Sequence, residues 1–226
     1  RVKIGTLNSY QKYYDGMVRK LYGDRHLTNF RGEHIQKLYN DLLEEGYALS
    51  SIKIVSAVLN GCFEQAVKNG IIEKNPVKLA ELPRQMERKE RKAMTKEQQT
   101  LFMSYAKDSY LYNFYAVLLR TGLRNGEARG LKYYDIDRKQ GVLHIRRTLK
   151  YIEGQGYFED TPKTKTSKRD IPLTPEIIKL LEAQLHYWAF EVESIDRYLF
   201  CNEHGEPLSR DRVQAEINRI ISKIRN

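Results

Sequence analysis

The chain has 226 residues, of which 41% are hydrophobic and 30% are charged. No apolar run approaches the roughly 18 residues that span a bilayer, and none resembles a signal peptide, so we expect one or two globular domains and neither a membrane nor a secreted protein. Lysine and arginine outnumber the acidic residues by 39 to 29, and this net charge of +10 favours an anionic partner such as nucleic acid.

The N-terminal part of the chain is expected to form an all-helical domain. Apolar side chains recur at helical spacing over residues 6–21 and again over residues 32–45. A third, longer helix is expected to open at Ser50 or Ser51, because serine is a favoured N-cap. Asn75 and the proline after it permit one more short helix, which would make four.

A charged segment separates these helices from the rest of the chain. Residues 83–93 hold five basic and two acidic residues without an apolar period. This is typical of an exposed basic linker, or of a solvated helix end. We therefore expect a first domain at residues 1–82, this linker, and a second domain at residues 94–226.

The second domain is expected to be α+β, mostly helical with a small antiparallel sheet. Thr95 and Gln98 have the spacing of a capping box, and Gly122 is placed to end a strongly apolar helix. The pattern then changes to that of strands and back to helices. The later elements are expected to be a short helix at 125–131, strands at 142–151, 157–161 and 168–173, a helix capped by Thr174, a short strand at 198–200 and a last helix capped by Ser209.

The two cysteines, Cys62 and Cys201, lie far apart, and neither belongs to a metal-binding spacing. This argues for a reducing compartment and against a structural zinc site. Cys62 falls on the apolar face of the third expected helix, which predicts a buried thiol. The chain starts at Arg1 rather than at methionine, which suggests a piece excised from a longer protein.

Two segments are suited to phosphate contacts. Arg124 lies at the turn into a helix, where its guanidinium and exposed backbone N–H groups can meet a phosphate, and Glu127 can pair with it. An ordinary surface Arg–Glu pair is the alternative. Residues 161–173 carry four cations and four hydroxyls between two expected strands, which predicts a basic hairpin tip or, alternatively, a solvated loop.

Three ordered motifs resemble the tyrosine recombinase (phage integrase) family. They are TGLRNGEARGLKYYDID, PKTKTSKRDIPL and YLFCNEHGEPLSRDRV. The N-terminal helices resemble the family's core-binding domain, a SAM-like fold of four helices, and the family's order is kept over essentially the whole chain. The sequences of these motifs are most similar to those of integrases of conjugative transposons and Gram-positive phages.

This resemblance implies site-specific DNA recombination, the integration or excision of a mobile element, with no metal or nucleotide cofactor. In this family a tyrosine hydroxyl attacks a DNA phosphate and leaves a 3′-phosphotyrosyl bond, with electrostatic stabilisation of the transition state. The implied partner is double-stranded DNA at a core recombination site, bound by a homotetramer of the complete enzyme, and there is room for accessory DNA-bending factors. The implied location is the bacterial cytoplasm, on the nucleoid.

The resemblance also implies roles for particular residues. Arg124 matches the family's first catalytic arginine, which grips the nonbridging oxygens of the scissile phosphate, and Glu127 matches a supporting acidic position. Lys163 best matches the hairpin lysine that protonates the departing 5′ oxygen, and Lys165 is its rival. In this family the two domains form a C-shaped clamp that binds opposite faces of a DNA duplex, which implies phosphate contacts from both domains. The candidates for these contacts are Lys53, Lys165, Arg210 and Arg212.

The chain departs from the family after its last motif. The family continues with an H-x-x-R box, a further His or Trp and the nucleophilic tyrosine, whereas none of the 16 tyrosines here follows a credible box. His144 to Arg147 fits the letters but is expected in a strand, and His204 is expected in a turn. We therefore assign no nucleophile, and we expect a catalytic domain truncated at its C-terminal end that binds DNA without cleaving it.

Two other functions are compatible with parts of this pattern. A non-catalytic duplex DNA-binding protein could keep the fold and lose the chemistry. A basic helical RNA-binding protein would need stacking aromatic residues in an RNP- or KH-like context, and none is present.

Overall fold

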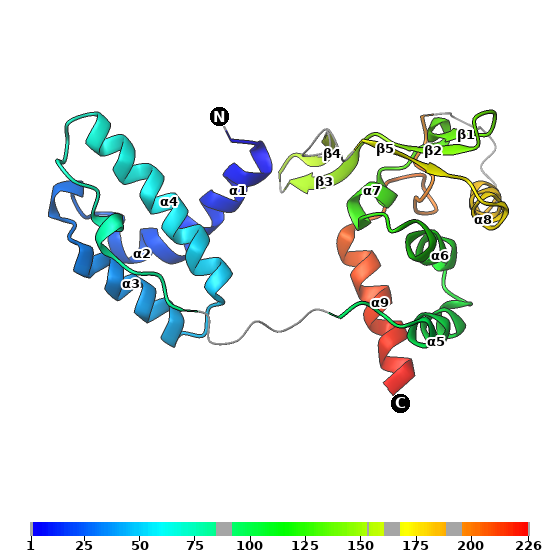
Figure 1. The fold of residues 1–226 in the computed structure, drawn as a ribbon, viewed down its shortest axis with the longest axis horizontal. Helices are drawn as coiled ribbons and strands as arrows, with labels where there is room; N and C mark the ends of the chain where they lie inside the picture. Colours follow the sequence, from blue (N-terminus) through cyan, green and yellow to red (C-terminus); the bar gives the residue numbers. More distant parts are fainter. Residues whose placement is uncertain (1, 85–91, 153, 161–167, 189–195, 226) are drawn as a thin grey trace. The chain divides into compact units, whose positions relative to one another are not determined.

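The structure, a computed structural model, describes residues 2–84, 92–152, 154–160, 168–188 and 196–225 (Figure 1). The chain divides into two compact units, Arg1–Arg91 and Lys92–Asn226, and each has a hydrophobic core of its own. In the described parts of both units, no helix is long and apolar enough to cross a membrane.

The first unit begins with a helix that changes its winding. Helix α1 spans Ile4–Tyr13 and helix α2 spans Arg19–Tyr22, and residues Tyr14–Val18 between them form a π-helical turn. The long helix expected at residues 6–21 is therefore wider in its middle. A π-turn carries an extra residue and shifts the faces of the residues beyond it. Leu21 and Leu7, both expected on the apolar face, are 59% and 54% exposed.

Helices α3 (Gly32–Glu44) and α4 (Leu49–Lys68) supply most of the first core, and a 3-10 turn at Pro76–Leu79 follows them, where a short helix was expected. Their buried side chains recur at spacings of three and four residues, as amphipathic helices require. The core consists of Val18, Ile35, Leu38, Tyr39, Leu42, Ile52, Val55, Leu59, Phe63 and Val77.

Two predictions about helix α4 are wrong. The residue at its N-cap is Ala48, so Ser50 and Ser51 lie inside the first turn and cap nothing. Cys62 is exposed instead of buried. Cys62 comes directly before Phe63 in α4, and Phe63 is 1% exposed. The side chains of consecutive residues in an α-helix point about 100° apart, so the two face different sides. Only one side of α4 is covered by the core, and Cys62 lies beyond its edge.

The helices of the second unit confirm the expected caps. They are α5 (Lys96–Ala106), α6 (Tyr112–Thr121), α7 (Asn125–Arg129), α8 (Pro175–Leu185) and α9 (Arg210–Arg225). The hydroxyls of Thr95, Thr174 and Ser209 each accept a hydrogen bond from the backbone N–H three residues further along. Helix α6 packs against α5 and α8, helix α5 packs against α9, and the short helix α7 packs against strand β3.

The strands form two small antiparallel sheets. One sheet has the order β1-β2-β5, and the other is the hairpin β3-β4. The strands are β1 (Ile136–Asp137), β2 (Val142–Ile145), β3 (Thr148–Ile152), β4 (Gly156–Asp160) and β5 (Arg169–Pro172). The expected mixture of many helices with a little antiparallel sheet is confirmed, but the β-residues are divided between two sheets.

Three expectations about the strands are corrected. The strand expected at 142–151 is two strands in different sheets, broken at Arg146 and Arg147. Residues 161–168 connect strands of different sheets, so in the described residues β4 and β5 do not form the expected hairpin. The strand expected at 198–200 is reduced to two isolated bridges, one at its first residue, Tyr198 with Lys132, and one just after it, Cys201 with Pro207.

Candidate functional site

The turn between α6 and α7 is shaped by glycine. Gly122 ends α6 with a φ of +63°, a left-handed conformation that costs glycine little, and its N–H donates to the Leu118 carbonyl at 2.9 Å. Gly126, in the first turn of α7, allows strand β3 to approach closely. A Cβ there would lie 2.5 Å from Thr148 Oγ1. These two glycines fix the backbone on both sides of Arg124.

Arg124 projects from this turn and is held at its base by Glu127. The Arg124 side chain is 71% exposed, whereas that of Glu127 is 4% exposed. Glu127 Oε2 accepts the backbone N–H of Arg124 at 2.9 Å, and Glu127 Oε1 accepts Arg124 Nη1 at 2.8 Å. Arg124 therefore presents an oriented guanidinium to solvent, a geometry suited to an oxyanion.

A second arginine, Arg169 on strand β5, approaches the same carboxylate. Its Nη2 lies 3.0 Å from Glu127 Oε2 and its Nη1 lies 3.3 Å from Glu127 Oε1. Burial alone would raise the pKa of the Glu127 carboxyl, but the hydrogen bonds from Arg169 and Arg124 outweigh it and hold that pKa below its ordinary value. Arg169 was not among the expected site residues, and no sequence signal pairs two residues 42 positions apart.

The two candidate lysines, Lys163 and Lys165, lie outside the described residues. The strands before and after them, β4 and β5, end at Asp160 and begin at Arg169.

The other candidate DNA contacts are exposed cations near helix starts. Lys53 is exposed in the second turn of α4, in the first unit. Arg210 and Arg212 are exposed in the first turn of α9, in the second unit. All three are accessible to a polyanion.

The start of α9 is tied to α7 by a buried arginine. Arg129 is 5% exposed, and its Nη1 donates to the Leu208 carbonyl at 2.8 Å, just before the Ser209 cap. Its Nη2 donates to the Leu149 carbonyl in β3 at 3.3 Å, and its Nε donates to Asn125 Oδ1 at 2.8 Å. The sequence pattern did not single out this residue either.

The residues that match the letters H-x-x-R have structural partners. His144 lies in strand β2, and its Nδ1 is 2.8 Å from Asp170 Oδ1 in the neighbouring strand. Arg146 pairs with the same Asp170 oxygen at 2.7 Å. Arg147 is hydrogen-bonded to the buried Asp135. The expected strand location is confirmed for His144 and Ile145, whereas Arg146 and Arg147 lie after the end of β2.

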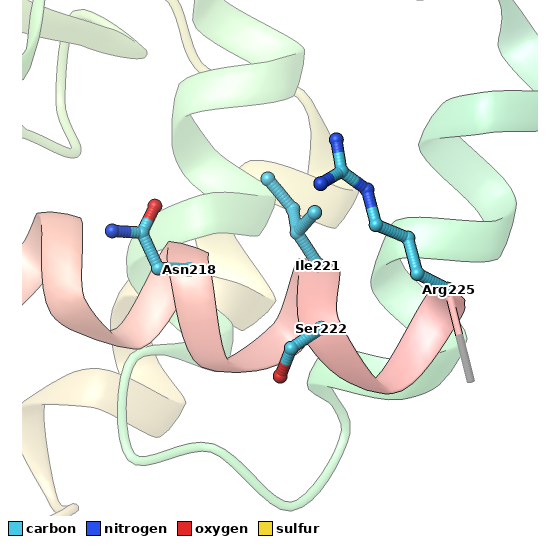
Figure 2. Close-up of a pocket in the computed structure, with 4 residues that line it drawn as sticks. All are labelled: Asn218, Ile221, Ser222 and Arg225. Atoms are coloured by element: carbon cyan, nitrogen blue, oxygen red, sulfur yellow. The ribbon is translucent and has the colours of Figure 1, made fainter.

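A shallow pocket of about 350 Å³ lies on helix α9, away from these residues. Figure 2 shows its lining side chains Asn218, Ile221, Ser222 and Arg225, with Ile221 and Arg225 extending on the same side of the helix. No candidate site residue lines it.

Among the described residues, no group of three or more His, Cys, Asp or Glu side chains could hold a metal ion.

Comparison with known proteins identifies relatives along the whole chain. The chain is 25% identical to a XerC-like tyrosine recombinase of Caldanaerobacter subterraneus over 98% of its length, and 32% identical to the ICEBs1 integrase of Bacillus subtilis over 70%. It is 25% identical to the Tn916 transposase of Enterococcus faecalis over 99%. The chain spans 62%, 41% and 57% of these relatives, so it corresponds to about half of their length.

Solved structures share the fold. The Tn1549 transposon integrase in complex with a circular intermediate DNA matches 99% of the chain with a TM-score of 0.83 and 23% identity, over 73% of the solved chain. A lambda integrase dimer bound to a core site matches 100% of the chain with a TM-score of 0.77 and 21% identity, over 59% of the solved chain. The family model described as "Phage integrase family" matches residues 87–225, which is more than half of the chain. The chain therefore belongs to the phage integrase family, whose relatives here are tyrosine recombinases and integrases of conjugative transposons and prophages.

Proposed function

We propose that this chain binds duplex DNA in a site-specific recombination reaction and supplies Arg124 to the phosphate at which a strand is cut. The observation that carries the proposal is the exposed guanidinium of Arg124, clamped to the buried Glu127 within the motif that matches the family. A fixed, outward-facing guanidinium can donate hydrogen bonds to two nonbridging oxygens of a phosphate without reorganising as charge develops.

The domains take the roles of their counterparts in the family. Residues 1–82 act as a helical core-binding domain, residues 83–93 as a basic linker, and residues 94–226 as part of the catalytic domain. The partner is double-stranded DNA, and the complete assembly is a homotetramer on it. Support comes from solved relatives: the Tn1549 and lambda integrases are bound to DNA, and one lambda integrase structure is a tetramer on a Holliday junction.

In the proposed chemistry, Arg124 stabilises the negative charge that grows on the scissile phosphate. Lys163, or its rival Lys165, gives a proton to the departing 5′ oxygen. The attacking group is a tyrosine hydroxyl, and the bond it forms to the 3′ phosphate retains the energy for religation. No tyrosine of these 226 residues is proposed for that role, because none follows an H-x-x-R box in a helix.

Binding to duplex DNA should weaken steeply with salt. Phosphate contacts release about 0.9 counterions each, so six to ten contacts lower the association constant by roughly 10³–10⁵ between 50 and 200 mM salt. Lys53→Gln, Arg210→Gln and Arg212→Gln should each reduce the log–log slope by about one. Fluorescence anisotropy on a labelled duplex measures this. A salt response that is flat, or duplex DNA that fails to displace bound RNA, would contradict the DNA-binding proposal.

The 226-residue chain should bind a nicked suicide duplex without forming a covalent adduct, whereas the complete translation product of its gene should form one. Denaturing gel electrophoresis of the mixture distinguishes the two. The alternative function, a non-catalytic DNA-binding protein, predicts binding without an adduct in both cases.

The two lysines should be separated by a leaving group that needs no acid. General acid catalysis contributes about 10²–10⁴-fold, so Lys163→Ala in the complete product should lose about that much cleavage on ordinary DNA. A 5′-bridging phosphorothiolate, whose thiolate leaves unprotonated, should restore the rate. Lys165→Ala is the matched control and should show neither the loss nor the rescue. The opposite pattern would move the role to Lys165.

A further inference from the structure

The charges around Glu127 do not cancel. One buried carboxylate receives hydrogen bonds from two guanidiniums, those of Arg124 and Arg169. If Arg124 were its only partner, the pair would be neutral, because the carboxylate of Glu127 would offset the positive charge of Arg124. With Arg169 present, the three side chains carry a net charge of +1.

The geometry assigns that surplus charge to the outer face of Arg124. Arg169 engages both oxygens of Glu127, and its side chain is 31% exposed, whereas the Arg124 side chain is 71% exposed. Glu127 reaches Arg124 through Nη1 of the guanidinium and through the backbone N–H. Among the described residues, Glu127 is the hydrogen-bond partner of this guanidinium, and the exposed remainder of it can face an anion.

The strand that carries Arg169 is fixed independently. In β5, Arg169 is paired with Ile145 of β2, and Ile145 is 1% exposed. The guanidinium of Arg169 is therefore delivered to Glu127 by a strand that the core holds in register. Arg169 also stands at the start of β5, directly after the segment that contains the candidate lysines.

We propose that Arg169 is a positioning residue of the recombination site: it supplies the counter-charge for Glu127, so that Arg124 stays oriented and its positive charge toward the scissile phosphate is not offset by the carboxylate. This inference rests on the proposed function, because it assigns Arg169 an action through Arg124. It adds a third residue to the Arg124–Glu127 pair and joins helix α7 to strand β5.

The test combines single and double variants in the complete translation product. Arg169→Gln should lower suicide-substrate cleavage by about 10- to 100-fold, since each pKa unit of lost charge interaction corresponds to about tenfold in rate. Arg169→Lys, which keeps the charge, should retain most of the activity. Glu127→Gln added to Arg169→Gln should recover about tenfold, because it removes the carboxylate that would otherwise neutralise Arg124.

A matched control and a second measurement keep the test independent of catalysis. Arg146→Gln removes another arginine that is paired with a carboxylate of β5, that of Asp170, and it should leave cleavage unchanged. Carboxyl ¹³C NMR titration of the 226-residue chain should show that Arg169→Gln raises the pKa of Glu127, because the hydrogen bonds from Arg169 help to hold it low.

The outcomes are separable. The role of Arg169 would be overturned if the double variant cleaved DNA no faster than Arg169→Gln alone. It would also be overturned if Arg169→Gln left the pKa of Glu127 unchanged. A wild-type product that neither binds nor cleaves DNA would overturn the proposed function instead, while the titration would still report whether Arg169 compensates Glu127.

Discussion

Replacing Arg124 with alanine in the complete translation product should reduce DNA cleavage by about 10²–10³-fold and leave DNA affinity nearly unchanged. Removing one preorganised donor to a developing oxyanion costs about that much in rate. Affinity depends on many phosphate contacts, of which Arg124 makes one, so the salt slope should fall by about one at most. Single-turnover cleavage with saturating protein measures the rate, and anisotropy measures the affinity.

Two control variants make this result specific. Arg124→Lys keeps the charge but loses the planar, two-pronged donor, so its cleavage rate should stay well below that of the wild type. Arg212→Ala, from the first turn of α9, should show the reverse pattern, with weaker binding and an unchanged rate at saturation. An Arg124→Ala protein that loses affinity and rate in equal measure would make Arg124 a docking residue.

Local features of the fold could be predicted from the sequence where they depend on neighbouring residues. The caps at Thr95, Thr174 and Ser209 each join residues three apart, and the left-handed end of α6 at Gly122 needs only one glycine. The pairing of Arg124 with Glu127 follows from the same short spacing. These features are properties of single turns, so composition and spacing suffice.

Features that depend on distant contacts could not be predicted. The extended run at 142–151 looks like one strand, but Arg147 turns inward to the buried Asp135, and the chain passes to a second sheet. Arg169 meets Glu127 only because β5 pairs with β2 across residues far apart in sequence. Cys62 follows the apolar pattern of α4, yet its face remains uncovered. In each case the partner, and not the segment itself, decides the outcome.

Replacing Arg129 with methionine should lower the free energy of unfolding by about 2–4 kcal/mol, because breaking a buried charged network leaves buried acceptors without donors. The Arg129 side chain is almost fully buried, and this burial lowers the pKa of its guanidinium. Its hydrogen-bond acceptors in the described residues are neutral oxygens: the carbonyls of Leu149 and Leu208 and the side chain of Asn125. Methionine fills similar space but donates nothing.

The loss should be visible as a fall in melting temperature of roughly 6–16 °C, at about 3–4 °C per kcal/mol for a unit of this size. Arg129→Lys should lose nearly as much, since one ammonium cannot reach three separate acceptors on α7, β3 and the start of α9. Exposed Arg212→Met is the matched control and should change stability by less than about 0.5 kcal/mol. If Arg129→Met melted like the wild type, its three hydrogen bonds would not hold α7, β3 and α9 together. Arg210 and Arg212 would then depend on the Ser209 cap and the apolar face of α9 for their positions.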